Sequence, residues 1–278
     1  MLAAEVIRTA PAGVELVLTD IEELDITDPD AVAALCRAEA PGLVINCAAY
    51  TAVDQAEADA ETAYAVNATG PAVLAGAAAR SAIPLIHIST DFVFFGDGSH
   101  PLTEDDAPAP RGVYACSKRA GELAIEDAGG QWLTVRTSWL YGAHGKNFPA
   151  TMLRLAAERD ELNVVDDQCG SPTYARDLAE ALWRLHAVGA RGYVHFSNTG
   201  ACTWYDLAVA AIAEARDQGL LDAGRQPQVH PVTTAEFPRP APRPAYSVMS
   251  TAKYARLAGA PPRPWREGLH NFIAELAS

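Results

Sequence analysis

The chain has 278 residues, 49% of them hydrophobic, and a formal net charge of -14. This length can build one large domain or two smaller ones with a real core. The negative charge argues against nucleic-acid binding, which needs a basic surface, and the sequence shows neither an apolar run of about 20 residues nor a signal peptide. We therefore expect a cytoplasmic protein without a nucleic-acid or membrane partner.

Apolar strands alternate with helices in the first half of the chain. The expected elements are a helix at 2–10, a strand at 14–18, a helix from 29 to about 36, a strand at 43–46, helices at 60–68 and 71–81, and a strand at 84–88. Continuous apolar strands separated by helices are typical of parallel βαβ units with both sheet faces covered. The predicted fold class is therefore α/β, with a Rossmann-like doubly wound parallel sheet.

The second half is less regular. The expected elements are a long loop at 96–112, a helix from 114, a strand at 132–136, helices at 149–159 and 176–186, a strand at 193–196, a helix capped by Thr203 and a non-helical proline-rich run at 237–244. We assign 1–141 to a dinucleotide-binding Rossmann-like core. Residues 142–278 are assigned mainly to a smaller α/β substrate-binding lobe at the C-terminal side, interleaved with the core.

Tyr114 and Lys118 stand four residues apart at the start of a predicted helix, so they share one face. A nearby ammonium would lower the phenol pKa from its usual value of about 10, which would allow Tyr114 to act as a general acid or base. Thr90, at the C-terminal end of the strand at 84–88, is placed to bind the same reacting oxygen. The pattern alone also fits a surface lysine beside a half-buried tyrosine.

Four longer strings narrow the class of protein. They are residues 46–54 (NCAAYTAVD), 87–94 (HISTDFVF), 136–139 (RTSW) and 167–173 (DQCGSPT). In order and spacing they resemble the dTDP-4-dehydrorhamnose reductase family of the extended short-chain dehydrogenase/reductase superfamily. The resemblance implies that NADH or NADPH reduces the C4 carbonyl of dTDP-4-dehydro-L-rhamnose to give dTDP-L-rhamnose.

The resemblance also implies roles for the catalytic residues. Tyr114 would donate a proton to the carbonyl oxygen, and Thr90 would orient that carbonyl. Lys118 would lower the pKa of Tyr114 and bind the nicotinamide ribose, and Asn67 matches a superfamily residue that supports this lysine.

The substrate would be a dTDP-sugar. The residues expected to bind it are Thr90, Asp91, Trp139, Arg239 and Arg243. Asp91 and Trp139 match positions that contact the sugar in the resembling family. The two arginines of the proline-rich run either hold the diphosphate, which suits their planar donors, or lie exposed to solvent.

The implied cofactor-binding residues lie mostly at strand ends. They are Asp20, Asp25, Ile26, Ala48, Ala49, Tyr50, Thr51, Ile88, Tyr114 and Lys118. Small residues such as Ala48 let a dinucleotide approach the backbone. Asp20, at the end of the strand expected at 14–18, would bind ribose hydroxyls and favours NADH. Members of the family often use both cofactors.

The chain departs from the family at its start. The family begins with a strand and a Gly-rich turn that cradles the pyrophosphate at a helix N-terminus, and Met1 aligns with the end of that turn. We expect the strand and turn to precede Met1 in the native protein; otherwise the cofactor site is defective.

No carboxylate cluster matches the metal site of some members of the family, so no metal is predicted. A homodimer stays an option.

Two other functions stay open. The absent turn favours a non-catalytic nucleotide-binding regulatory subunit of the same family. A nucleotide-sugar dehydratase or epimerase is the other alternative, and Phe92 disfavours a dehydratase because those enzymes carry a glutamate there.

Overall fold

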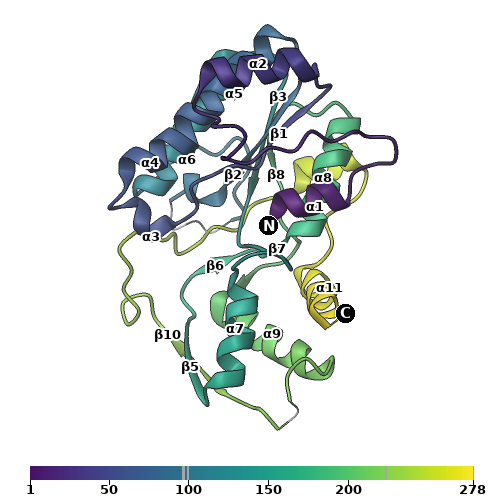
Figure 1. Ribbon diagram of the computed structural model, residues 1–278. Helices are drawn as coiled ribbons and strands as arrows, with labels where there is room; N and C mark the ends of the chain where they lie inside the picture. Colours follow the sequence, from purple (N-terminus) through teal and green to yellow (C-terminus); the bar gives the residue numbers. More distant parts are fainter. Residues whose placement is uncertain (96–97, 99, 223, 278) are drawn as a thin grey trace.

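The computed structural model describes residues 1–95, 98, 100–222 and 224–277, and its centre is a parallel sheet (Figure 1). The strands lie in the order β1 (Val44–Asn46), β2 (Leu85–Thr90), β3 (Trp132–Thr137) and β8 (Gly192–His195). All three pairings between them are parallel. The predicted parallel sheet is confirmed.

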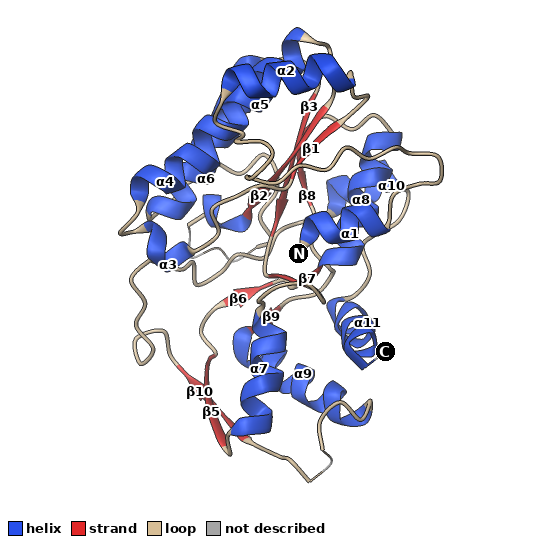
Figure 2. Ribbon diagram, viewed as in Figure 1, coloured by secondary structure: helices blue, strands red, loops and turns tan. Residues whose placement is uncertain are grey.

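Helices cover both faces of this sheet (Figure 2). One face carries α2 (Pro29–Glu39), α5 (Gly70–Arg80) and α6 (Val113–Ala128), and the other carries α1 (Leu2–Arg8), α8 (Ala175–Ala187) and α10 (Ala252–Ala258). Successive strand residues point to opposite faces, so Leu85 packs with Ile125 of α6 while Ile86 packs with Leu178 of α8. The apolar run of β2 follows from this double burial.

A second lobe lies beyond the C-terminal ends of the strands (Figure 1). It contains α7 (Phe148–Glu158), β5 (Glu161–Val165), α9 (Trp204–Asp217), β10 (Gln228–Val232) and α11 (Trp265–Ala277). These elements share one apolar cluster, in which Leu153, Leu207 and Phe272 are buried. Because α8, β8 and α10 return to the sheet, the lobe and the sheet are interleaved along the chain.

Short elements join the two parts. They are α3 (Val53–Ala56), α4 (Ala60–Tyr64), the π-helical turn η1 (Ala65–Thr69), the 3-10 turn η2 (Asp91–Val93), β4 (Leu140–Tyr141), β6 (Cys169–Gly170), β7 (Thr173–Tyr174) and β9 (Cys202–Thr203). The predicted cap Thr203 forms a capping box with Asp206 at the start of α9, and Asp28 caps α2 by accepting hydrogen bonds from two of its amides. The described part of the loop at 96–112 forms no helix or strand, and residues 96, 97 and 99 lie outside the described residues. Within the described ranges, no helix is long and apolar enough to cross a membrane.

The strand expected at 14–18 is wrong. These residues form an exposed loop, and Val17 and Leu18 are 54% and 60% exposed. A strand needs a neighbour for its backbone hydrogen bonds, and among the described strands β1 pairs only with β2. Asp20 therefore ends no strand, and its carboxylate accepts a hydrogen bond from the Ile21 amide at 2.7 Å.

Gly121 lets α6 lie directly against η1. A Cβ at this position would stand 2.1 Å from the Asn67 carbonyl oxygen. Alanine normally favours a helix over glycine by about 1 kcal/mol, but here we expect Gly121→Ala to lower the free energy of unfolding by roughly 1–3 kcal/mol through overpacking. Urea denaturation measures this change in the free energy of unfolding.

Gly42→Ala is the matched control, because a Cβ added at Gly42 would meet no atom within 4 Å. A Gly121→Ala protein as stable as the Gly42→Ala protein would contradict the close packing of α6 on η1.

Candidate active site

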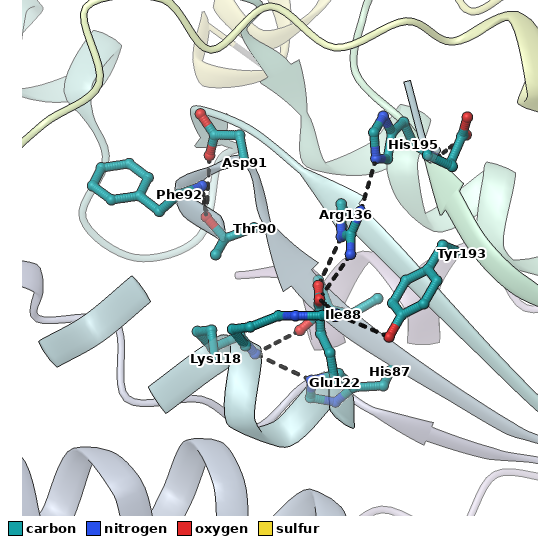
Figure 3. Close-up of polar contacts among 12 residues, drawn as sticks. His87, Ile88, Thr90, Asp91, Phe92, Lys118, Glu122, Arg136, Tyr193 and His195 are labelled. Carbon is teal, nitrogen blue, oxygen red and sulfur yellow. Dashed lines mark hydrogen bonds and ion pairs between the residues drawn. The ribbon is translucent and has the colours of Figure 1, made fainter. Parts of the chain in front are cut away.

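The predicted catalytic residues meet at the C-terminal ends of the strands. Thr90 is the last residue of β2 and pairs with Thr137, the last residue of β3. Tyr114 and Lys118 lie in the first turns of α6, and both are at least nine-tenths buried. Figure 3 shows Lys118 reaching β2 and Thr90 standing next to Asp91 at the end of that strand. The structure thus brings Thr90, Tyr114 and Lys118 together.

The pKa of the Tyr114 phenol is higher than expected. Burial raises the pKa of Tyr114 to about 12, although a hydrogen bond with the Thr90 side chain acts in the lowering direction. The expected lowering by Lys118 is wrong: the net shift is upward, and the Lys118 amine hydrogen-bonds the Ile88 carbonyl of β2. Tyr114 is therefore a protonated phenol at neutral pH, which suits a proton donor.

Lys118 is held by two atoms of β2 (Figure 3). Its Nζ donates to the Ile88 carbonyl at 2.7 Å and lies 3.3 Å from His87 Nε2. Burial lowers the pKa of Lys118 to about 8, and the Glu122 carboxylate opposes this shift. The charge of Lys118 therefore changes close to neutral pH.

The site has a second buried acidic group besides the Tyr114 phenol, the carboxyl group of Asp91. Thr90 Oγ1 donates to its Oδ1 at 3.1 Å. Burial raises the pKa of Asp91 to about 6, while hydrogen bonds with Ser247 and Thr90 act in the lowering direction. Asp91 is thus mainly a carboxylate at neutral pH and can accept hydrogen bonds from a polar ligand.

A buried ion pair that was not predicted from the sequence lies behind Lys118. Glu122, four residues along α6, receives two hydrogen bonds of 2.8 Å from Arg136 on β3 and a third from Arg119 (Figure 3). Arg136 also lies over the rings of Phe94 and Tyr193. This pair fixes α6 against the sheet at the position of the catalytic residues.

Asn67 does not contact the lysine directly. Its side chain accepts from the Tyr50 amide at 2.9 Å and donates to the Tyr50 carbonyl and to Ser117 Oγ, each at 3.0 Å. It therefore joins the segment after β1 to the residue preceding Lys118. Support of Lys118 by Asn67 through the active-site network stays a prediction, and the direct contact with the lysine amine is made by His87, whose role was not predicted.

The expected cofactor residues fall into two groups. Ala48, Ala49, Tyr50 and Thr51 follow β1 and are exposed or half-buried, and Ile88 supplies the carbonyl that holds Lys118. Small residues at a strand end let a dinucleotide approach the backbone closely, and binding of the cofactor by these residues stays a prediction. Asp25 and Ile26 lie farther along: Asp25 accepts from Thr27, and Ile26 packs beside Gly70 at the start of α5.

Trp139 has a strained backbone. Its φ is +47°, which is unusual for a bulky residue. Its ring stacks on Trp204, with centroids 3.6 Å apart, and a Cβ at Gly170 would overlap it. A residue held in such a conformation by its neighbours is a candidate for a ligand-binding role, and its place two residues after β3 puts it at the catalytic end of the sheet.

Arg239 and Arg243 both face Asp54. Arg243 binds this carboxylate through two nitrogens at 2.5 Å and 3.0 Å, whereas Arg239 lies 3.9 Å from it and over the ring of Phe237. The neighbouring Pro242 lies against Gly112, which precedes α6. The proline-rich run is thus tied to the catalytic helix, and phosphate binding by either arginine stays a prediction.

The doubly wound sheet, with a tyrosine, a lysine and a threonine at its strand ends, defines a reductase of the short-chain dehydrogenase/reductase type. The family described as the RmlD substrate binding domain matches residues 1–278, so the chain belongs to the dTDP-4-dehydrorhamnose reductase family. The match does not bear on the strand expected before Met1, which stays a prediction.

Individual relatives support this placement. The chain is 46% identical over 278 residues to a dTDP-4-dehydrorhamnose reductase of Mycobacterium tuberculosis, covering 98% of this chain and 88% of that protein. A probable dTDP-4,6-dihydroxy-2-methyloxan-3-one 4-ketoreductase of Streptomyces antibioticus is 42% identical, over 99% and 92%. The crystal structure of a dTDP-4-dehydrorhamnose reductase from Bacillus anthracis in complex with NADP has 38% identity, a TM-score of 0.92 and coverage of 99% and 95%.

Proposed function

We propose that this chain reduces the C4 carbonyl of dTDP-4-dehydro-L-rhamnose to give dTDP-L-rhamnose, with NADH or NADPH as reductant. The observation that carries the proposal is the buried Tyr114 phenol, which is hydrogen-bonded to Thr90 at the end of β2 and shares the buried face of α6 with Lys118. The proposal is supported by the family membership of the chain and by a relative of 46% identity that is named dTDP-4-dehydrorhamnose reductase.

The chemistry needs one hydride and one proton. The reduced nicotinamide supplies the hydride to the carbonyl carbon when it is bound. Tyr114 donates its proton to the carbonyl oxygen, which Thr90 orients, and the product is an alcohol. Because the pKa of Tyr114 is about 12, its proton is retained until negative charge develops on the substrate oxygen.

The same residues supply binding. Ala48 and Ala49 allow close approach of the nicotinamide half, and Lys118 would hold its ribose. Asp91 would accept hydrogen bonds from the sugar hydroxyls, and Trp139 would cover the sugar ring. Arg239 and Arg243 would bind the diphosphate if they released the Asp54 carboxylate and contacted the phosphate oxygens in its place.

The test incubates the purified chain with dTDP-4-dehydro-L-rhamnose and either NADH or NADPH. We expect substrate-dependent loss of reduced-nicotinamide absorbance and formation of dTDP-L-rhamnose, identified by mass spectrometry and NMR. Folded protein that binds cofactor yet oxidises none of it in the presence of this substrate would overturn the proposal. A parallel assay with the substrate of the 4-ketoreductase relative decides between the two sugars.

Lys118→Met should lose both turnover and cofactor binding. The variant keeps much of the side-chain length but removes the amine that would bind the ribose. We expect kcat to fall by about a hundredfold or more and calorimetry to show weaker NADH binding. Lys146→Met is the control, because Lys146 is exposed; unchanged NADH affinity in Lys118→Met would contradict the ribose contact.

A further inference from the structure

The residue that Lys118 meets on β2 is a fully buried histidine (Figure 3). His87 Nε2 lies 3.3 Å from Lys118 Nζ, and His87 Nδ1 lies 3.1 Å from Asn46 Nδ2. A neutral imidazole has one nitrogen that donates and one that accepts. Which of the two carries the hydrogen therefore decides what His87 presents to the lysine.

The Asn46 amide settles the tautomer. Asn46 Oδ1 accepts from the Ala48 amide at 3.0 Å, so Nδ2, which only donates, faces His87 Nδ1. His87 Nδ1 must then accept, and the imidazole hydrogen lies on Nε2. The reversed amide would set its NH2 group against the Ala48 N–H, two donors facing each other in a buried site.

The Nε2–H group points at Lys118 Nζ. An ammonium has three donors and no acceptor, whereas a neutral amine has a lone pair. Only the amine can accept from His87 while it donates to the Ile88 carbonyl. We propose that Asn46 and His87 are positioning residues, which fix the Nε2–H tautomer and so favour the neutral amine of Lys118.

The charges around Lys118 leave its two states close in energy. Glu122 on α6 favours the ammonium, but this carboxylate is itself paired with Arg136 of β3 and with Arg119. On β2, burial and the nearby Lys118 hold the pKa of His87 well below its usual value, so the imidazole stays neutral. The direction of the His87 hydrogen bond then shifts the balance toward the amine.

The consequence of the His87 tautomer for catalysis depends on the proposed function. After Tyr114 has given its proton to the substrate oxygen, the phenolate regains a proton from solvent. A neutral Lys118 amine that accepts from His87 Nε2–H keeps two N–H groups, one for the Ile88 carbonyl and one for the nicotinamide ribose. The tautomer itself does not depend on the reaction.

The test is NMR of the full chain labelled with ¹⁵N-histidine and ¹³Cε-lysine. The lysines of the chain are Lys118, Lys146 and Lys253, so Lys118 can be resolved, and spectra of His87→Gln and Lys118→Met assign the signals. We expect His87 to carry its hydrogen on Nε2 at neutral pH, and Lys118 to titrate below the usual pKa of a lysine, which is about 10.4.

Asn46→Asp should reverse the arrangement. One carboxylate oxygen accepts from the Ala48 amide and the other from His87 Nδ1–H, so Nε2 becomes an acceptor. We expect the proton affinity of Lys118 to rise about tenfold or more, which is one pKa unit. Asn163→Asp, at an exposed position of β5, adds the same charge without touching His87 and should change neither signal.

Three results would overturn the proposal: a hydrogen on His87 Nδ1 in the wild type, an Asn46→Asp variant that keeps the Nε2–H tautomer, or one whose Lys118 titration is unchanged. If Asn46→Asp fails to fold, the wild-type tautomer still decides. A chain that shows the Nε2–H tautomer but no reductase activity would refute the proposed function alone.

Discussion

Tyr114→Phe is expected to lower kcat by about 10²–10⁴-fold, the usual contribution of a positioned general acid. The change removes one hydroxyl and little volume, so the T-shaped contact between this ring and Phe92 is kept. The affinity for NADH, measured by calorimetry, should stay within about twofold of the wild-type value. The measurement is the steady-state rate of NADH loss with dTDP-4-dehydro-L-rhamnose.

Tyr64→Phe provides the control, because Tyr64 is an exposed tyrosine on α4. It should keep the wild-type rate. If Tyr114→Phe also turned over at that rate, Tyr114 would be a packing residue and another group would protonate the substrate. A loss of NADH binding together with activity would mean that the phenol acts mainly by binding the cofactor and not by protonating the substrate.

The sheet and its helices were predictable where the sequence carries a local signal. The strand at β2 is a continuous apolar run, and Asp28-Pro29 marks the start of α2. The loop at 14–18 has the same β-forming composition as a strand, yet a strand exists only if a neighbour accepts its hydrogen bonds. Composition cannot report whether that neighbour is present.

The positions of Tyr114 and Lys118 on α6 were predictable, but their proton affinities were not. Spacing places Tyr114 and Lys118 on one face of α6, as the structure confirms. Their pKa values depend on burial and on the direction of the lysine amine. Neither can be predicted from the fact that the two residues stand four positions apart. His87 did carry a signal, since a histidine inside an apolar strand needs a buried polar partner.

The pair of Glu122 and Arg136 was missed because its members come from different elements. Arg136 stands in a strand and Glu122 in a helix, and either could have faced solvent. Only the packing of α6 on the sheet brings them into contact. The largest effect on stability should come from this pair.

Glu122→Gln is expected to lower the free energy of unfolding by about 3–5 kcal/mol, the usual cost of leaving a buried charge without its partner. Arg136 is 1% exposed, and the glutamine cannot balance its charge. Burial would raise the pKa of Glu122, but the hydrogen bonds and charge of Arg136 outweigh it and hold that pKa below 4.5. The wild-type contribution is therefore complete above pH 4.5 and is lost as the pH falls below it.

Urea denaturation at neutral and acidic pH measures both effects. Glu158→Gln is the control: it breaks the exposed pair of Arg154 and Glu158 and should cost less than about 1 kcal/mol. The double variant Glu122→Gln with Arg136→Met should be more stable than Glu122→Gln alone, because it removes the unpaired charge. If Glu122→Gln were no more destabilising than Glu158→Gln, water or another group would have to reach Arg136, and the pair would not be what fixes α6 to the sheet beneath Tyr114 and Lys118.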